Sequence, residues 1–405
     1  MANTVFSSKD FKPELLNTFF QSIAQREEKI KIIRNWQKAI ENGTVHKKKE
    51  EQLKGEFLDK FFGLVLGYAY ESHEAEWNIE KEFKSISDGK KPDAALGFFD
   101  SQGKQDVRCV IEVKGGLINL DKKQNRVDFQ GSAVDQAFSY VPRMPGQCAW
   151  VIVTNMIEIR FYAARDISRY ESFLINELLL ADNLQRFFFL LSYNQLFLEG
   201  GGSRIDGLFM ERQAEQKKIS AEFYNAYHDL RLALFADLQK SHPKILPKKL
   251  FGHTQKLIDR IIFICFVRDR ELVSSSLFAD VHESVKKSFR KKKESVWTEL
   301  KHLFVAMNDG LEESGRDIPE FNGGLFKEDE ELNSLHIKDH QLTAIINFVA
   351  SYDFQSQLDV NILGHIFEQS ISDIEEFQSR TALAPRCHDA FRPRARLRRP
   401  RSPRR

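Results

Sequence analysis

Two carboxylates and one lysine are placed where they could do hydrolytic chemistry. Asp93 follows Pro92 at the start of an apolar segment, and Glu112 and Lys114 lie two residues apart in the next one. Cutting a phosphodiester at neutral pH needs a divalent cation, oxygen ligands that hold it, and a group that positions or deprotonates the attacking water. Magnesium is bound by few carboxylates and keeps several waters. These residue types therefore suit metal-dependent phosphodiester hydrolysis.

The local pattern predicts a β-hairpin that brings the three side chains together. The runs AALGFF and VRCVIEV are strand-like, and the turn-rich SQGKQD joins them. Side chains two residues apart on a strand point to the same face, so Glu112 and Lys114 should share one. Charges in an otherwise apolar strand are costly unless they are paired or bound to a metal. An acid followed by E-x-K is also common by chance, and a weak surface salt bridge is the alternative interpretation.

The surrounding sequence predicts the elements that would position this hairpin. The expected helices span 8–42, 51–68 and 132–144, and the expected strands flanking the hairpin span 77–86, 148–155 and 157–164. This order predicts a mixed α/β domain over residues 1–170. From 171 to 377 the apolar residues recur every three to four positions, which predicts a mainly α-helical connector region.

The tail, residues 378–405, differs from the rest in composition. It contains ten arginines, no lysine, one acidic residue and four prolines. It has no hydrophobic period and is predicted to be disordered. One interpretation is a basic arm that grips phosphate. The abrupt change in composition favours the other, an out-of-frame end. Without the tail, 50 basic and 57 acidic residues remain, so residues 1–377 would bind DNA through local basic patches and not through their overall charge.

The overall composition excludes several classes of protein. The chain of 405 residues is 42% hydrophobic and 29% charged, as expected of a soluble globular protein with two or three domains. It has neither an apolar run of about 18 residues nor a signal-peptide core, so we expect a cytoplasmic protein that does not contact membranes. Its four cysteines form no C-x-x-C pair, which indicates neither a zinc site nor a disulfide framework.

Pro92-Asp93 and Glu112-Val113-Lys114 together resemble the signature of the PD-(D/E)-x-K nuclease superfamily. The resemblance implies a metal-dependent DNA endonuclease in which Asp93 and Glu112 bind Mg²⁺, and Lys114 orients the water and neutralises the attacked phosphate. It also implies a third metal ligand, Glu56, on the preceding helix. A polar side chain on the following helix, Gln136, would join the site. For both of these residues ordinary surface polarity is the alternative.

A second resemblance covers the helical region. PEFNGGLF at 319–326, DVNILGHIFEQSI at 359–371, and FYNAYHDLR followed by LIDRIIFICFVRDREL look like the connector of type IIG restriction–modification enzymes of the Eco57I group. In that group nuclease, connector, adenine methyltransferase and recognition domains follow one another. The Gly-rich S-adenosylmethionine loop and the (N/D)-P-P-(Y/F) loop are missing from this sequence. We therefore expect an enzyme truncated before the methyltransferase, without an S-adenosylmethionine site.

A basic cluster in the helical region is a candidate contact for DNA phosphates. It is formed by Lys286, Lys287, Arg290, Lys291, Lys292 and Lys293. A solvated helix face is an equally good interpretation. The expected partner is double-stranded DNA, with a transient homodimer on DNA as a hypothesis for double-strand cleavage. The alternatives to a nuclease are a catalytically inactive DNA-binding or regulatory remnant and an unrelated helical scaffold.

Overall fold

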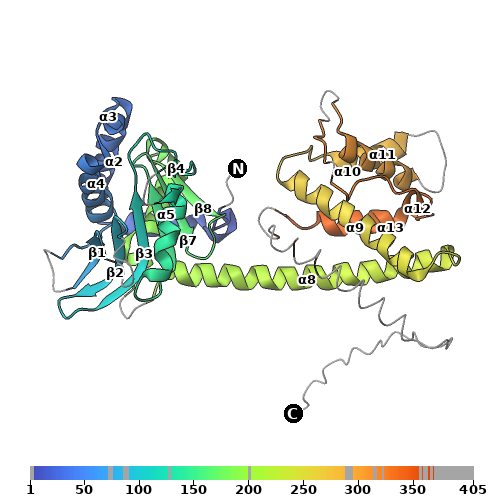
Figure 1. Cartoon of the computed structure of the whole chain (residues 1–405), viewed down its shortest axis with the longest axis horizontal. Helices are drawn as coiled ribbons and strands as arrows, with labels where there is room; N and C mark the ends of the chain where they lie inside the picture. The colour runs from blue at the N-terminus through green and yellow to red at the C-terminus, as the bar shows by residue number, and fades with distance from the viewer. Residues whose placement is uncertain are drawn as a thin grey trace, which may run out of the picture. The chain divides into compact units, whose positions relative to one another are not determined.

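The chain forms two compact units. The computed structural model describes residues 4–71, 76–84, 91–125, 129–198, 202–287, 295–312, 317–321 and 323–354, with Leu358, Gly364 and Glu368. Unit 1 spans Met1–Lys217 and unit 2 spans Lys218–Arg405. The long helix α8 (Arg204–Ser241) contributes to both units (Figure 1). The predicted tail, residues 378–405, lies outside the described residues.

Unit 1 is built on a six-stranded mixed sheet (Figure 1). In spatial order its strands are β1 (Glu76–Lys81), β2 (Ala94–Asp100), β3 (Gln105–Val113), β6 (Trp150–Thr154), β7 (Glu158–Ala163) and β8 (Tyr170–Leu174). The pair β3–β6 is parallel and the other pairs are antiparallel. β2 and β3 are the hairpin that the sequence predicts, so the mixed α/β fold expected for this region is present.

The crossover between the parallel strands β3 and β6 carries helix α5 (Ala133–Tyr140). Ser132 begins the helix with a capping box, because its hydroxyl accepts from the Asp135 N–H at 3.1 Å while the Asp135 carboxylate accepts from the Ser132 N–H at 2.8 Å. A two-stranded ribbon of β4 (Gln124–Asn125) and β5 (Gln130–Gly131) precedes it. α5 packs on β3 and β6 and so covers one face of the sheet.

Helices from both ends of unit 1 cover the other face. They are α1 (Pro13–Ser22), α2 (Arg26–Glu41), α3 (Thr44–Lys47), α4 (Glu50–Phe57), α6 (Ala181–Leu191) and α7 (Tyr193–Leu196). α4 continues into the π-helical turn η2 (Leu58–Val65). Phe57 is fully buried there and stacks on Phe61 with ring centroids 4.6 Å apart. The compact unit therefore extends past residue 170, where the sequence suggested a boundary, because β8, α6 and α7 share this core.

The side chains of strand β3 alternate between the hydrophobic cores on the two faces of the sheet. Cys109, Ile111 and Val113 pack with the helices α2 and α4, whereas Val110 packs with α5. Successive side chains on a strand point to opposite faces, so the even-numbered positions at the end of β3 belong to the α5 face. Glu112 is one of these positions, and Lys114 follows it directly after the strand.

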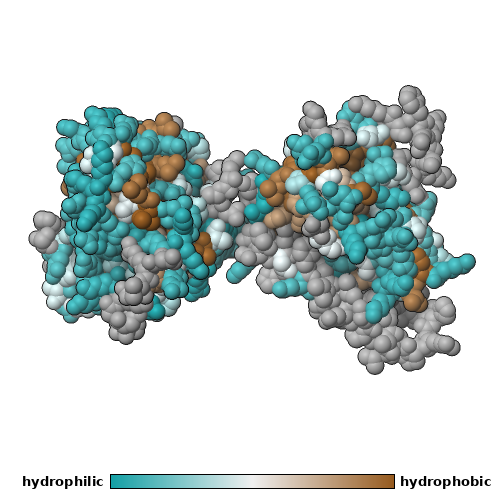
Figure 2. All heavy atoms as spheres, turned by 45° about the horizontal axis from the view of Figure 1, so that its top comes forward, coloured by the Kyte–Doolittle hydropathy of each residue, from teal (hydrophilic) through white to brown (hydrophobic). Residues whose placement is uncertain are grey.

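Unit 2 is helical, as expected for the connector region. Besides the end of α8 it contains α9 (Pro247–Asp269), α10 (Leu277–Lys287), α11 (Ser295–Asp309), α12 (Glu330–Asn333) and α13 (Asp339–Ala350). None of the described helices in the chain is both long and apolar enough to span a membrane. Hydrophilic side chains cover most of the visible face of each unit, with smaller apolar areas between them (Figure 2).

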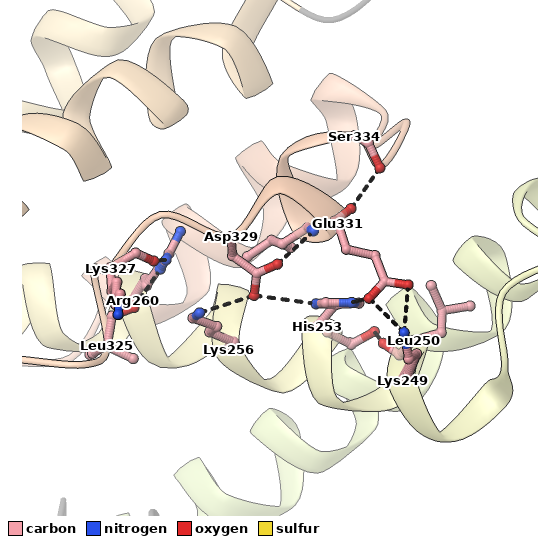
Figure 3. Close-up of polar contacts among 12 residues, drawn as sticks. Lys249, Leu250, His253, Lys256, Arg260, Leu325, Lys327, Asp329, Glu331 and Ser334 are labelled. Carbon is pink, nitrogen blue, oxygen red and sulfur yellow. Dashed lines mark hydrogen bonds and ion pairs between the residues drawn. The ribbon is translucent and has the colours of Figure 1, made fainter.

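Polar contacts fix the chain after residue 320 to α9 (Figure 3). The buried Arg260 donates to the carbonyl oxygens of Leu325 and Lys327, both at 2.8 Å. Asp329 accepts from the Leu332 N–H at 3.0 Å and caps α12, and it also pairs with Lys256 at 3.0 Å. The segments LIDRIIF and PEFNGGLF are thus in direct contact, which gives the two connector-like motifs a structural role. The third, residues 359–371, lies outside the described residues except for Gly364 and Glu368.

Asp259 gives unit 2 a pH-dependent contribution to stability. Burial raises the pKa of Asp259 to about 7, although hydrogen bonds from Gln255 and Tyr227 and the charge of Arg231 oppose the rise. Between about pH 4 and pH 7 the folded chain keeps a proton that the unfolded chain has released, so stability falls as pH rises through this window.

The free energy of unfolding of the wild type should therefore fall by about 2–4 kcal/mol between pH 4 and pH 7 because of Asp259, and Asp259→Asn should abolish this part of the fall. Thermal unfolding of wild type and variant across this range measures it. The difference in Tm, variant minus wild type, should become more positive from pH 4 to pH 7 and then level off. A difference that stays constant over the range would show that Asp259 does not titrate in this way.

Candidate active site

The predicted residues Asp93, Glu112 and Lys114 meet where β3 ends. In the β2–β3 register Ala94 is opposite Ile111, so Asp93, one residue before β2, lies beside Glu112. Asp93 Oδ2 accepts a hydrogen bond from the Val113 N–H at 2.8 Å. The ammonium of Lys114 donates to Glu112 Oε1. The hairpin therefore brings together two carboxylates and one ammonium at one edge of the sheet.

Glu112 and Lys114 form a buried charged pair. Glu112 is 2% exposed and Lys114 is 1% exposed. Burial raises the pKa of Glu112 to about 8; the charges of Asp93 and Glu50 add to the rise, while Lys114 opposes it. Glu112 Oε2 is buried and accepts no hydrogen bond from the part of the chain that the structure describes. A buried, unpartnered carboxylate oxygen is costly in a purely structural ion pair and is suited to a cation ligand.

Helix α4 contributes two more charged side chains to this edge. Lys54 contacts Asp93 Oδ1 at 2.6 Å, and Glu50 Oε2 accepts from the Gly115 N–H at 2.9 Å. Glu50 and Lys54 are four residues apart and lie on one face of the helix. Burial works to lower the pKa of Lys54, but the hydrogen bond and charge of Asp93 outweigh it, so this pKa lies above its ordinary value. Both oxygens of Asp93 thus already have protein donors.

Glu56 is not brought to this cluster. Its side chain is 44% exposed and pairs with Lys60 at 2.5 Å, one turn further along the helix. The α4 glutamate that contacts the segment after Lys114 is Glu50, through the Gly115 N–H, and Glu50 was not among the residues predicted from the sequence. Its spacing of four residues from Lys54 was the available signal, but only the tertiary contact with Gly115 reveals it.

Gln136 is connected to the cluster indirectly, through a hydrogen bond to Tyr140. The Gln136 side chain on α5 donates from Nε2 to the Tyr140 hydroxyl at 2.9 Å. Burial and the charge of Glu112 raise the pKa of Tyr140 to about 12, so its phenol stays protonated at neutral pH. Gln136 therefore orients a neutral hydroxyl whose electrostatic environment includes Glu112 and Asp93.

The basic cluster of unit 2 is only partly described. Lys286 is exposed at the end of α10, and Lys287 is the last residue of that helix. Arg290, Lys291, Lys292 and Lys293 lie outside the described residues. The role suggested for this cluster in binding phosphates stays a prediction.

The donor set at the end of β3 suits magnesium better than a metal that needs an all-protein cage. Among the residues that the structure describes, no three His, Cys, Asp or Glu side chains are arranged to hold a metal ion. Magnesium is commonly bound through one or two carboxylates and completes its shell with waters and substrate phosphates. Asp93 and Glu112, with the unpartnered Oε2, fit that requirement.

The comparisons with known proteins find similarity to the sequence of a restriction enzyme and, remotely, to a solved structure. A proposed type II restriction enzyme and methyltransferase of Methanocaldococcus jannaschii, RM.MjaORFECS2P, is 30% identical over 158 residues, and the match covers 32% of this chain and 13% of the relative. The chain is similar to part of a restriction–modification enzyme. The matched part of this chain thus corresponds to only a small part of that relative's length.

No protein-family model matches the chain. Among solved structures, a chain of the cryo-electron microscopy structure of a DrdV–DNA complex matches with a TM-score of 0.26 and 13% identity. That match covers 87% of this chain and 29% of the other. A TM-score this low supports no conclusion about the site.

Proposed function

We propose that unit 1 is a Mg²⁺-dependent endonuclease of the PD-(D/E)-x-K type that hydrolyses phosphodiester bonds in double-stranded DNA. We further propose that it is the nuclease part of a type IIG restriction–modification enzyme. The observation that carries the proposal is the buried Glu112–Lys114 pair beside Asp93, in which Glu112 keeps one unpartnered oxygen. The similarity to a proposed restriction enzyme supports DNA as the substrate.

Asp93 and Glu112 would hold the magnesium ion, which supplies Lewis-acid polarisation of the phosphoryl oxygen and stabilises developing negative charge. Lys114, fixed by its contact with Glu112, would orient the attacking water and neutralise the attacked phosphate. Gly115 N–H holds Glu50 beside this group, so Glu50 would contribute a further negative charge that favours cation binding. Gln136 would keep the Tyr140 hydroxyl in place at the α5 side of the site.

Cleavage of supercoiled plasmid by the purified protein tests this function. The reaction is run with Mg²⁺ and with EDTA, and Lys114→Ala protein prepared in the same way controls for contaminating nucleases. Nicking or cutting that requires Mg²⁺ and the wild-type lysine supports the proposal. Cutting of equal strength in EDTA, or by the variant, would show that these residues are not the source of activity. DNA binding without any cleavage would favour an inactive DNA-binding remnant.

Lys54 should compete with the metal ion for Asp93. Its ammonium is only 2.6 Å from Asp93 Oδ1. A metal ion that binds this oxygen must therefore displace the ammonium or share the oxygen with it. Displacing a part-buried ion pair costs about 1 kcal/mol. We expect Lys54→Met to tighten Mn²⁺ binding about three- to tenfold, measured as the Kd by calorimetry or electron paramagnetic resonance.

Lys60→Met is the matched control for this measurement. Lys60 pairs with the exposed Glu56 at 2.5 Å and has no contact with Asp93. Its replacement should leave the Mn²⁺ affinity of the protein unchanged. Weaker binding by Lys54→Met would mean instead that Lys54 holds Asp93 in its binding position.

A further inference from the structure

The three consecutive lysines Lys47, Lys48 and Lys49, here called the lysine run, lie beside the proposed active site. Lys47 ends α3, and Lys49 immediately precedes α4. On one side of the run, Val45 is buried and packs against the Gly116 backbone. The packing is so close that a Cβ atom on residue 116 would be only 3.0 Å from Val45 Cγ1. On the other side, Glu50 accepts from the Gly115 N–H at 2.9 Å. Contacts with the two glycines after Lys114 therefore bracket the run.

This bracketing limits how far the lysine run can be from the site. Consecutive Cα atoms are about 3.8 Å apart, so each lysine is at most two residues, or about 7.6 Å of backbone, from Val45 or Glu50, which touch the Gly115–Gly116 segment. The position of the run's backbone relative to Lys114 is thus fixed by packing on both sides. A flexible arm would lack such contacts.

The lysine run is exposed and has no acidic partner among the described residues. All three side chains are exposed, and within the described parts of the chain none of them forms an ion pair. The lysines at the proposed active site do have acidic partners, since Lys54 pairs with Asp93 and Lys114 pairs with Glu112. Three unneutralised cations therefore lie next to the proposed active site.

A DNA substrate requires such cations. The site contains the carboxylates of Asp93, Glu112 and Glu50, which repel a phosphate, and residues 1–377 carry more acidic than basic residues. A protein with an acidic body binds DNA through local basic patches that neutralise phosphates and release counterions. Such contacts position the duplex without reading its sequence.

We propose that the lysine run binds the backbone phosphates of duplex DNA next to the scissile phosphate, an inference that rests on the proposed nuclease function. Each lysine neutralises a phosphate and holds the duplex against the end of β3. These residues supply affinity and register, and the chemistry stays with Asp93, Glu112 and Lys114.

The salt dependence of DNA binding tests this directly. A short fluorescein-labelled duplex is titrated in EDTA, where it is not cut, and its Kd is measured by anisotropy over a range of KCl concentrations. The slope of log Kd against log salt falls by about 0.9 for each phosphate that the protein no longer neutralises. We expect Lys47→Gln/Lys48→Gln/Lys49→Gln to lower the slope by about two to three, and each single variant to lower it by about one.

A triple variant of three other exposed lysines of unit 1, Lys9→Gln/Lys12→Gln/Lys217→Gln, removes the same formal charge. It should leave the slope unchanged. Equal decreases in slope for both triple variants, or a wild-type slope in the lysine-run variant, would overturn the inference. The single variants keep the test valid if the triple variant melts at a lower temperature.

Plasmid cleavage separates this inference from the function on which it rests. Mg²⁺-dependent cleavage by wild-type protein together with an unchanged slope in the lysine-run variants would leave the nuclease in place and reject the lysine run as its DNA contact. A wild-type protein that neither binds the duplex nor cuts plasmid would reject both.

Discussion

Lys114→Ala should reduce Mg²⁺-dependent plasmid cleavage by about 10²–10³-fold, the usual loss when one preorganised group that stabilises transition-state charge is removed. Lys114 is 1% exposed and its ammonium contacts Glu112 Oε1, so its position is fixed before any substrate arrives. Initial rates of supercoiled plasmid loss at saturating Mg²⁺ measure the effect.

Loss of folding is the competing explanation for such a result, and the structure indicates how to separate the two. Removing one member of a buried ion pair typically costs about 3–5 kcal/mol when the other charge is left unpaired. Glu112 can avoid this cost, because burial raises its pKa and Lys114 opposes that rise; without Lys114 the pKa rises further and the carboxylate takes up a proton at neutral pH. The variant should therefore remain folded.

Lys114→Met is the companion variant, because it keeps the side-chain volume in a fully packed position. Thermal unfolding followed by circular dichroism reports whether each variant is folded. A folded Lys114→Met protein that cleaves plasmid at the wild-type rate would show that the ammonium has no part in the reaction. Loss of cleavage in both folded variants would assign the loss to the charge itself.

The features of this site that could be predicted from the sequence are local ones. Glu112 and Lys114 share a side because strand residues alternate, and the turn-rich SQGKQD folds β2 back against β3 so that Asp93 reaches them. Ser132 marks the start of α5 by its capping interaction with Asp135. Each of these depends on residues close in the sequence or joined by one tight turn.

The features that could not be predicted depend on tertiary packing. β8 and the helices α6 and α7 complete the core of unit 1, although their apolar spacing alone grouped them with the helical region. The side of α4 that faces the hairpin is decided by contacts between distant segments, such as Glu50 with Gly115 and Lys54 with Asp93. Amphipathic spacing fixes which residues share a helix face, but not which neighbour that face meets.

Glu50 and Glu56 make this limit testable within one helix. Six residues are about 1.7 turns of an α-helix, so the two glutamates project in different directions. Glu50 is held by the Gly115 N–H and its charge acts on Glu112, while Glu56 is exposed and pairs with Lys60. Sequence spacing alone could not choose between them.

We expect Glu50→Gln to weaken Mn²⁺ binding and to lower plasmid cleavage by about 10- to 100-fold, the usual effect of losing a group that supports metal ligands. The amide keeps an acceptor for the Gly115 N–H, so the change removes mainly the negative charge. Glu56→Gln should change neither quantity, because an exposed ion pair contributes little. Calorimetric Kd values and cleavage rates for the two variants measure this. The reverse pattern, with loss only in Glu56→Gln, would mean that α4 turns its other face to the metal when the substrate is bound.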